Sequence, residues 1–271
     1  MNSPLLVDGY GVRLSVNRGR LVIDHGMGAD RRRRELSRVE RRIRRIAILA
    51  DTGTISLRAI RWCADVGIAV AQVDRDGRVL LHAAPPGTDD ARLRRAQAAA
   101  ASSDVGVAVA RTVLVAKLTG HARVARDVLG QDTIAGHLDE TARELDTVTD
   151  LATCRDTEAQ AASVYFAAWA GRVHCRFAEK ERPKVPDHWG VFTARRSAIR
   201  HSKSPRLATD PVNALLNYGY ALAEVECRLA TIALGLDPGM GILHTDTKNR
   251  DSLALDLLEA VRPTVEAHVL T

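Results

Sequence analysis

The stretch "RVLLHAAPPGTDDARLRRAQAAAA" (78–101) decides the fold class, because the character of the chain changes within it. Its first six residues form a short apolar run that is typical of a strand. Its last part is rich in Ala, Leu and Arg, which favour a helix. The prolines and the glycine between these parts indicate a turn. We therefore expect a β-rich N-terminal part and a helical C-terminal part, with the boundary near Pro86.

Upstream of this boundary, short apolar runs are separated by turn residues such as "DGYG" and "NRG". This pattern predicts strands over 5–9, 11–16, 20–25, 43–50, 68–73 and 78–83, and a short helix over 54–67. Residues 1–86 are therefore expected to form a small β-rich domain. Because a small sheet has edges to cover, we expect this domain to mediate a homodimer.

Downstream of the boundary the pattern is helical. Residues 90–120 and 142–171 carry Ala, Leu and Arg at helical spacing. Two prolines and a glycine make 179–190 a long loop. Residues 87–271 are therefore expected to form a larger all-α domain, and the fold class is α+β.

Composition narrows the class of protein. Of the 271 residues, 46% are hydrophobic and 27% are charged, so a packed globular core is expected. No apolar run approaches the roughly 20 residues of a membrane span, and the N-terminus lacks the pattern of a signal peptide. The four cysteines form no C-x-x-C pair, which argues against a zinc ribbon and a disulfide scaffold. A cytoplasmic protein that does not bind a membrane fits these features.

The net charge of +6 is concentrated in two basic runs. Residues 31–45 hold nine Arg and two Glu, and residues 170–206 hold ten Lys or Arg and three acidic residues, so each run carries +7. Concentrated positive charge is typical of a protein that binds a polyanion. A solvated charged face remains the alternative for either run.

Aromatic residues gather in the second basic run. Eight of the ten lie between residues 165 and 220. We expect Tyr165, Phe166 and Trp169 to fill a helix core. Trp189, in "PDHWGVFTARR", is instead a candidate for stacking on a nucleic-acid base.

Near the C-terminal end, "GILHTDTKNRDSLALDLLEAVRP" (241–263) combines a histidine with carboxylates. We expect a helix that begins after an N-cap at Ser252 and stops at Pro263. Asp256 and Glu259 are three residues apart, so they share one face of that helix. With His244 they make an oxygen and nitrogen ligand set that suits Mn²⁺ or Mg²⁺ better than zinc. The alternative is an ordinary solvated acidic face.

A further carboxylate, Glu158, lies in "RDTEAQAASVYFAAW" (155–169). We expect it in the first turn of a helix, where a negative charge is favourable. It also lies on the side of the apolar stripe, so it needs a partner. A contact with the helix dipole, or a salt bridge to an Arg, is the alternative to metal binding.

These segments resemble the "Cas one" family of CRISPR-associated integrases and endonucleases. The resemblance covers nearly the whole chain: "LLVDGYGVRLSVNRGRLVI", "IAILADTGTISLRAIRWCADVGIAVAQVDRDG" and "TEAQAASVYFAAW" are similar to family segments. The most specific part is residues 210–263. The resemblance implies that Glu158, His244 and Glu259 bind a divalent cation, Mg²⁺ or Mn²⁺, with Asp256 close to that cation.

The resemblance also implies an activity and partners. Family members cut and join DNA, attacking the CRISPR repeat with a spacer 3′-hydroxyl, and they form homodimers that assemble with the small partner "Cas two". Residues 87–271 would then be the metal-dependent catalytic domain. Double-stranded DNA, as spacer precursor and repeat, would lie along the second basic run, at Trp189, Arg195, Arg196, Arg200, Lys203 and Arg206.

Two departures from the family pattern leave an alternative open. Ala159 stands where a glycine commonly follows the helix glutamate, and the helical domain is shorter at its C-terminal end, at Thr271. The first function is a metal-dependent DNA integrase and nuclease. The alternative is a DNA-binding scaffold of the same complex without catalysis. A metallohydrolase of small phosphate esters is a third reading, and it would need a concave pocket.

Overall fold

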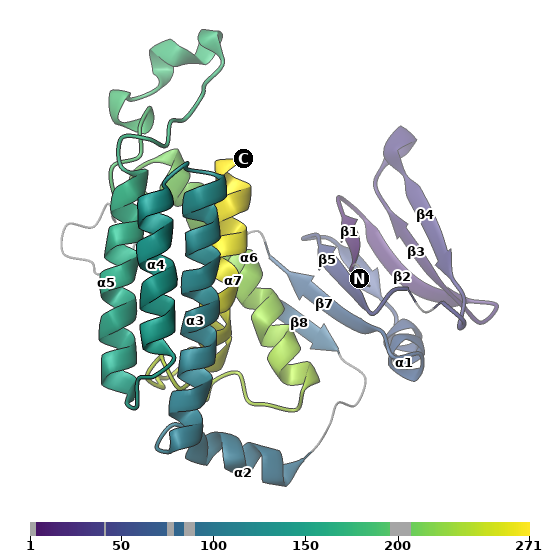
Figure 1. Ribbon diagram of the computed structural model, residues 1–271. Helices are drawn as coiled ribbons and strands as arrows, with labels where there is room; N and C mark the ends of the chain where they lie inside the picture. The colour runs from purple at the N-terminus through teal and green to yellow at the C-terminus, as the bar shows by residue number, and fades with distance from the viewer. Residues whose placement is uncertain (1–3, 41, 75–78, 84–89, 196–206) are drawn as a thin grey trace. The chain divides into compact units, whose positions relative to one another are not determined.

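The computed structural model describes residues 4–40, 42–74, 79–83, 90–195 and 207–271. The chain divides into two compact units (Figure 1). The first comprises Met1–Asp89 with Ala233–Gly235, and the second comprises Asp90–Ile232 with Leu236–Thr271. The expected boundary at residue 86 lies outside the described residues. A β-rich N-terminal part followed by a helical part confirms the predicted fold class.

The first sheet of unit 1 has the strand order β1-β5-β7-β8. Its strands are β1 (Leu5–Asp8), β5 (Arg45–Leu49), β7 (Ala69–Val73) and β8 (Val79–Ala83). The first three are parallel and β8 is antiparallel to β7. Apolar side chains from β1, β5 and β7 enter one core, including Val7, Ile46 and Val70.

The second sheet has the order β4-β3-β2-β6. Its strands are β2 (Val12–Asn17), β3 (Arg20–His25), β4 (Arg32–Leu36) and β6 (Gly53–Ile55), with the 3₁₀ turn η1 (Gly28–Asp30) before β4. Strand β4 lies inside the first basic run, where no strand was predicted. Four consecutive arginines hide the alternation that marks a strand, and charged side chains are typical of an edge strand such as this one.

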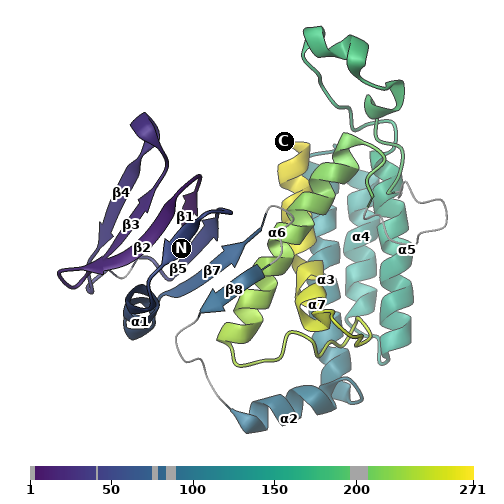
Figure 2. The same cartoon turned by 180° about the vertical axis from the view of Figure 1, so that it is seen from behind.

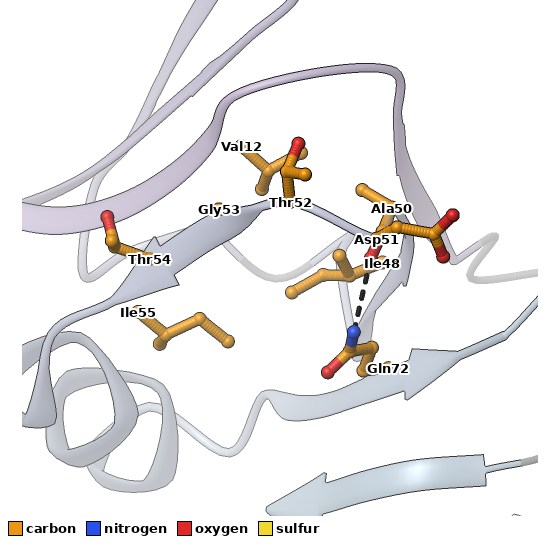
Figure 3. A pocket seen from close by; sticks show the side chains of 9 residues that line it. All are labelled: Val12, Ile48, Ala50, Asp51, Thr52, Gly53, Thr54, Ile55 and Gln72. Carbon is orange, nitrogen blue, oxygen red and sulfur yellow. Dashed lines mark hydrogen bonds between the residues drawn. The ribbon is translucent and has the colours of Figure 1, made fainter.

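Helix α1 (Leu57–Asp65) packs on the second sheet, with Ser56 as its N-cap. The indole N–H of Trp62 donates to the carbonyl of Gly19 (2.8 Å). A helix was predicted over 54–67 and is present, but it is shorter than predicted, because residues 54 and 55 belong to β6. Beside β6 lies an open hollow, shown in Figure 3, and Asp51 is the one charged residue among those that line it. The amide of Gln72, also in this hollow, donates to the carbonyl of Ala50 (3.1 Å).

Unit 2 is built from six α-helices among its described residues, and Figures 1 and 2 show α3, α4 and α5 side by side. The helices are α2 (Ala91–Ala100), α3 (Asp104–Asp127), α4 (Asp132–Leu145), α5 (Leu151–Trp169), α6 (Pro211–Ala233) and α7 (Ser252–Leu270). Helix α3 is central, because it packs against α4, α5 and α7. The loop after α5 contains the 3₁₀ turns η2 (Glu179–Lys184) and η3 (Asp187–Trp189).

The expected ends of α7 were wrong. Its N-cap is Asp251, and Ser252 is buried with its hydroxyl donating to the carbonyl of Thr245 (3.2 Å). The helix also continues through Pro263 to Leu270. The ring of Pro263 packs against Gly120 of α3, where an added Cβ would lie 2.6 Å from the ring. This close packing outweighs the local tendency of proline to end a helix.

Within the described part of the chain, α3 is the one helix long and apolar enough to cross a membrane by length and composition. Such a helix is also typical of the core of a helical domain. Its buried residues include Lys117 and His121, and both face other helices of unit 2. These contacts identify α3 as a core helix of this unit.

Candidate functional site

Three helices of unit 2 bring charged side chains together. Lys117 on α3 donates hydrogen bonds to Oε1 of Glu158 on α5 and to Oε2 of Glu259 on α7 (2.5 Å for Glu259). The lysine side chain is only 4% exposed. The two predicted carboxylates therefore do converge, and an ammonium group joins them.

Glu158 is not in the first turn of a helix, as the sequence suggested. Helix α5 begins at Leu151, with Asp150 as its N-cap, so Glu158 lies in the middle of the helix. The dipole of the helix end therefore does not stabilise this carboxylate. Its partner is Lys117, a lysine and not one of the arginines that sequence analysis considered.

Asp256, one turn before Glu259 on α7, holds the loop that carries His244. Its Oδ2 accepts from the backbone N–H groups of Ile242 (2.6 Å) and Leu243 (3.0 Å). Its Oδ1 accepts from the backbone N–H of His244 (2.8 Å) and lies 2.7 Å from ring Nδ1 of the same residue. Because an ionised carboxylate can only accept, Nδ1 carries a proton and donates it.

This clamp leaves the other imidazole nitrogen available. Nε2 of His244 lies 4.0 Å from Oε1 of Glu259. A histidine whose Nδ1–H is held by a carboxylate presents the lone pair of Nε2, which is the usual arrangement of a metal-binding histidine. Helix α5 fixes the same loop, since Arg155 donates to the carbonyls of Ile242 and Leu243 (both 2.9 Å).

Positive charges surround Glu259. The guanidinium of Arg262 lies 3.2 Å from its Oε1, while Lys117 occupies Oε2. Burial alone would raise the pKa of Glu259, but the positive charges of Lys117 and Arg262 lower it by more than burial raises it. The pKa of Glu259 therefore lies below its ordinary value. Glu259 is therefore ionised at neutral pH.

Two turns further along α7, a second polar cluster is fully buried. Glu266 accepts hydrogen bonds from the hydroxyls of Tyr165 (2.9 Å) and Tyr220 (2.5 Å). Nε2 of His121 lies 3.1 Å from the same carboxylate, although not in the direction of a linear hydrogen bond, and its ring stacks on Tyr165. Tyr165 and Trp169 fill the core as predicted, and Phe166 is partly buried and packs against it. Tyr165 also has a polar partner.

The chemical types of these residues, carboxylates and an imidazole from separate segments of the chain, suit a divalent cation. The carboxylates of Glu158 on α5 and Glu259 on α7 share the ammonium of Lys117, and Nε2 of His244, from the loop before α7, lies 4.0 Å from Oε1 of Glu259. As the side chains stand, no three His, Cys, Asp or Glu residues of the described part form a metal-binding group. The ammonium of Lys117 instead bridges the two carboxylates, so the site already attracts positive charge.

Sequence comparison matches residues 5–271 to the family described as "CRISPR associated protein Cas1". The chain belongs to the Cas1 family. A Cas1 relative from Pyrobaculum aerophilum, "CRISPR-associated endonuclease Cas1 2", is 29% identical over 98% of this chain and 81% of its own length. A Rhodospirillum rubrum protein of the same name is 33% identical over 74% of this chain and 57% of its own length.

Solved structures agree with this membership. A "Casposase bound to integration product" is 26% identical, with a TM-score of 0.71 over 99% of this chain and 72% of that one. A Cas1 protein from Thermotoga maritima shares the fold, with a TM-score of 0.63, 18% identity, and coverage of 99% of this chain and 77% of that chain. The resemblance of the sequence to the Cas1 family is thereby confirmed.

The predicted DNA contacts of this Cas1 chain are only partly described. Arg196, Arg200, Lys203 and Arg206 lie outside the described residues. Trp189 is 37% exposed in η3, so its side chain is accessible to a ligand. In Figures 1 and 2 its loop projects beyond the end of α5. The assignment of Trp189 as a DNA contact stays a prediction.

Arg195 has partners inside unit 2. Its guanidinium donates to the side-chain oxygens of Asn213 (2.7 Å) and Asn217 (3.0 Å) on α6. It also lies over the rings of Tyr220 and Phe166. Burial lowers the pKa of Arg195, and these contacts give it a structural role that the sequence did not predict.

Sequence analysis missed Lys117, Arg155 and Arg262. One signal was present for Lys117: it stands between Leu114 and His121 at helical spacing, so it falls on the buried face of an otherwise apolar segment. A lysine on such a face needs a charged partner. Nothing in the local sequence indicates that this partner is Glu158 or Glu259.

Proposed function

We propose that this chain is a divalent-metal-dependent DNA endonuclease and integrase that inserts spacers into a CRISPR array by transesterification. The observation that carries the proposal is the convergence of Glu158, Glu259 and Nε2 of His244, with Asp256 holding the imidazole. Membership of the Cas1 family, whose relatives are named endonucleases, supports the same activity.

Glu158, Glu259 and His244 would hold Mg²⁺ or Mn²⁺. Asp256 would not be a direct ligand, because both of its oxygens are engaged with the His244 loop. Asp256 would instead act by holding His244 in place. This role agrees with the prediction that Asp256 lies close to the metal without being one of its main ligands. The bound cation would polarise a phosphoryl oxygen and stabilise the charge of the in-line displacement.

Arg262 would assist at the edge of this site. Its side chain is 30% exposed and one guanidinium nitrogen reaches Glu259. A guanidinium so placed can both keep Glu259 ionised and contact a phosphate oxygen. No protein nucleophile is needed, since the attacking group is the 3′-hydroxyl of the spacer.

The proposed partners are double-stranded DNA, a second copy of this chain and Cas2. A casposase with integration product and a TtCas1-DNA complex are among the similar solved structures, and they support DNA as the partner. A Cas6-RT-Cas1–Cas2 complex shares the fold at 18% identity. The homodimer would form through unit 1, and light scattering of a stable monomer at micromolar concentration would contradict it.

The activity is tested with purified protein, Mn²⁺ and branched DNA, alongside a spacer with free 3′-hydroxyls and a plasmid that carries a CRISPR repeat. We expect Mn²⁺-dependent cleavage of the branch and joining of the spacer. Glu158→Gln and Glu259→Gln should abolish both products while DNA binding persists. Asp139→Asn, which removes a surface ion pair with Arg126, is the matched control and should behave like the parent.

One observation favours a second function, the DNA-binding scaffold without catalysis. The ammonium of Lys117 already pairs with both carboxylates that would bind the metal. If the scaffold function is right, the parent protein binds branched DNA but gives no product at any Mn²⁺ or Mg²⁺ concentration. The Glu158→Gln variant would then be indistinguishable from the parent.

A further inference from the structure

Lys117 is a buried cation whose two counter-charges are the two proposed metal ligands. Its ammonium bridges Glu158 and Glu259, and its side chain is almost entirely buried. Both carboxylate side chains are also largely buried, 21% exposed for Glu158 and 8% for Glu259. The lysine therefore offsets part of the negative charge between α5 and α7.

The bridge reduces the electrostatic repulsion between the two carboxylates of a metal-binding site that holds no metal. Two carboxylates held close together in a partly buried place repel each other and are costly to leave unpaired. A cation between them removes that repulsion and keeps both oxygens pointing at one place. Lys117 therefore holds the two ligands near the positions that a shared cation needs.

The anchoring of α3 makes this bridge well defined. Gly120 lies one turn beyond Lys117 and packs directly against Pro263 of α7. Helix α3 also packs against α5. The backbone of Lys117 is thus fixed relative to both glutamates, and only its flexible stem can move.

A lysine suits a cation that must later give way. An ammonium is a single charge at the end of four methylene groups, so a change of rotamer withdraws it. A guanidinium would instead grip carboxylates with a rigid fork. A divalent ion needs the same oxygens that the ammonium occupies, so the two cations compete for Glu158 and Glu259.

We propose that Lys117 is a positioning residue of the metal site, a tethered cation that occupies Glu158 and Glu259 until a divalent ion displaces its ammonium. The inference rests on the proposed function, since it takes these two residues as metal ligands. It predicts that Lys117 stabilises the metal-free protein and at the same time weakens metal binding. A lysine with a merely structural role would have the first effect without the second.

The test measures Mn²⁺ binding to the full chain by the loss of the free-ion electron paramagnetic resonance signal, and melting temperature by circular dichroism. Lys117→Met keeps the unbranched stem and removes the charge. We expect it to melt lower than the parent without metal, and to bind Mn²⁺ about tenfold tighter or more, because a unit charge beside the ion opposes binding. Lys117→Arg should melt near the parent and bind Mn²⁺ about tenfold more weakly, because the forked guanidinium does not withdraw.

Control variants separate the possible failures. Lys184→Met removes a lysine from an exposed ion pair with Glu181 and should change neither quantity. If Glu158→Gln and Glu259→Gln bind Mn²⁺ like the parent, the proposed metal site is wrong, and the inference falls with it. If those two variants lose Mn²⁺ while Lys117→Met binds no tighter and Lys117→Arg no weaker, the metal site stands and the role of Lys117 is overturned. If Lys117→Met does not fold, the Lys117→Arg measurement decides alone.

Discussion

Asp256 and His244 are joined twice, since both the backbone N–H (2.8 Å) and ring Nδ1 (2.7 Å) of the histidine meet Oδ1 of the aspartate. Asp256 is 2% exposed, so it is not a solvated charge on a helix face. Four donors from one loop share its two oxygens. The carboxylate therefore fixes the loop and the tautomer of the imidazole together.

Asp256→Asn tests this relationship. An amide keeps the size of the side chain but replaces one acceptor by a donor, which opposes the N–H groups of the loop. We expect Mn²⁺ affinity to fall by about 10- to 100-fold, the usual effect of losing a partner of a metal-binding histidine. Isothermal titration with Mn²⁺ measures it.

The control for this variant lies in the same loop. Asp246→Asn alters a carboxylate that accepts from the backbone N–H of Gly241 (2.8 Å), a contact that does not involve the imidazole. We expect the Mn²⁺ affinity of this variant to stay within about twofold of the parent, because the hydrogen bond of Asp246 holds Gly241 and not the His244 ring. Equal losses in Asp256→Asn and Asp246→Asn would mean that loop order, and not the tautomer of His244, sets the affinity.

A pair of glycines tests the packing of α3 on α7. A Cβ at Gly120 would lie 2.6 Å from the ring of Pro263, which cannot move aside, so Gly120→Ala should destabilise the protein by about 1–3 kcal/mol. A Cβ added at Gly136 in α4 would instead meet no other atom within 4 Å. Gly136→Ala should therefore stabilise by about 0.5–1 kcal/mol, through helix propensity.

Urea unfolding of both variants gives these values. Because Gly120 packs against Pro263, one turn beyond Glu259 on α7, an added methyl group would push α7 and Glu259 away from Glu158, so Gly120→Ala should lower Mn²⁺ affinity as well. A Gly120→Ala protein as stable as Gly136→Ala would show that α3 and α7 do not pack as closely as described.

Glu266 should make stability depend on acid pH. Burial would raise the pKa of Glu266, but His121 and the hydrogen bonds from Tyr220 and Tyr165 lower it by more, so the pKa lies below its ordinary value. Its contribution to stability is therefore fully present above about pH 5 and is lost as the pH falls through the lower folded pKa. At pH 7, Glu266→Gln should cost roughly 2–3 kcal/mol, because charged hydrogen bonds are lost.

Urea unfolding of the parent and Glu266→Gln from pH 7 to pH 3 measures this dependence. The gap between the two proteins should stay constant down to about pH 5 and narrow below the unfolded pKa of the carboxyl. The groups that face Glu266 are His121 on α3, Tyr165 on α5 and Tyr220 on α6. A gap that does not change between pH 5 and pH 3 would contradict an ionised Glu266.

Local sequence predicts much of this fold, and its failures have physical causes. The strands around Val7, Leu14 and Ile23 were found, because short apolar runs between turn residues are a local signal. Strand β4 was missed, because pairing with β3 decides it and not its own side chains. Pro263 was taken for a helix end, because contact with Gly120 is a tertiary effect that the local sequence does not contain.

The candidate site divides in the same way. Glu158, His244 and Glu259 were predicted as metal ligands from residue types and from resemblance to the Cas1 family. The partners of these residues were not, since Lys117 lies 41 residues from Glu158 and 142 from Glu259. Which cation a buried carboxylate meets depends on how the helices pack, so it could not be read from spacing.

Arg195 gives the last prediction, because its position in the second basic run suggested a DNA contact and its contacts suggest otherwise. It donates to Asn213 and Asn217, 18 and 22 residues away, and lies over the ring of Tyr220. Arg195→Ala should therefore destabilise the protein by roughly 1.5–3 kcal/mol, the cost of losing hydrogen bonds to a charged group. The salt dependence of duplex binding should not change.

The neighbouring arginines and lysine provide the contrast. If Arg200 and Lys203 each neutralise a phosphate, replacing both by Ala should lower the slope of log affinity against log salt by about 1.8, since each contact contributes about 0.9. Stability and Mn²⁺ affinity should stay near those of the parent. Fluorescence anisotropy with duplex DNA from 50 to 300 mM NaCl, a range wide enough for the roughly linear salt law, compares this double variant with Arg195→Ala. If Arg195→Ala lowers the slope and the double variant does not, the DNA path follows Arg195 and its contacts with α6 must open when DNA binds.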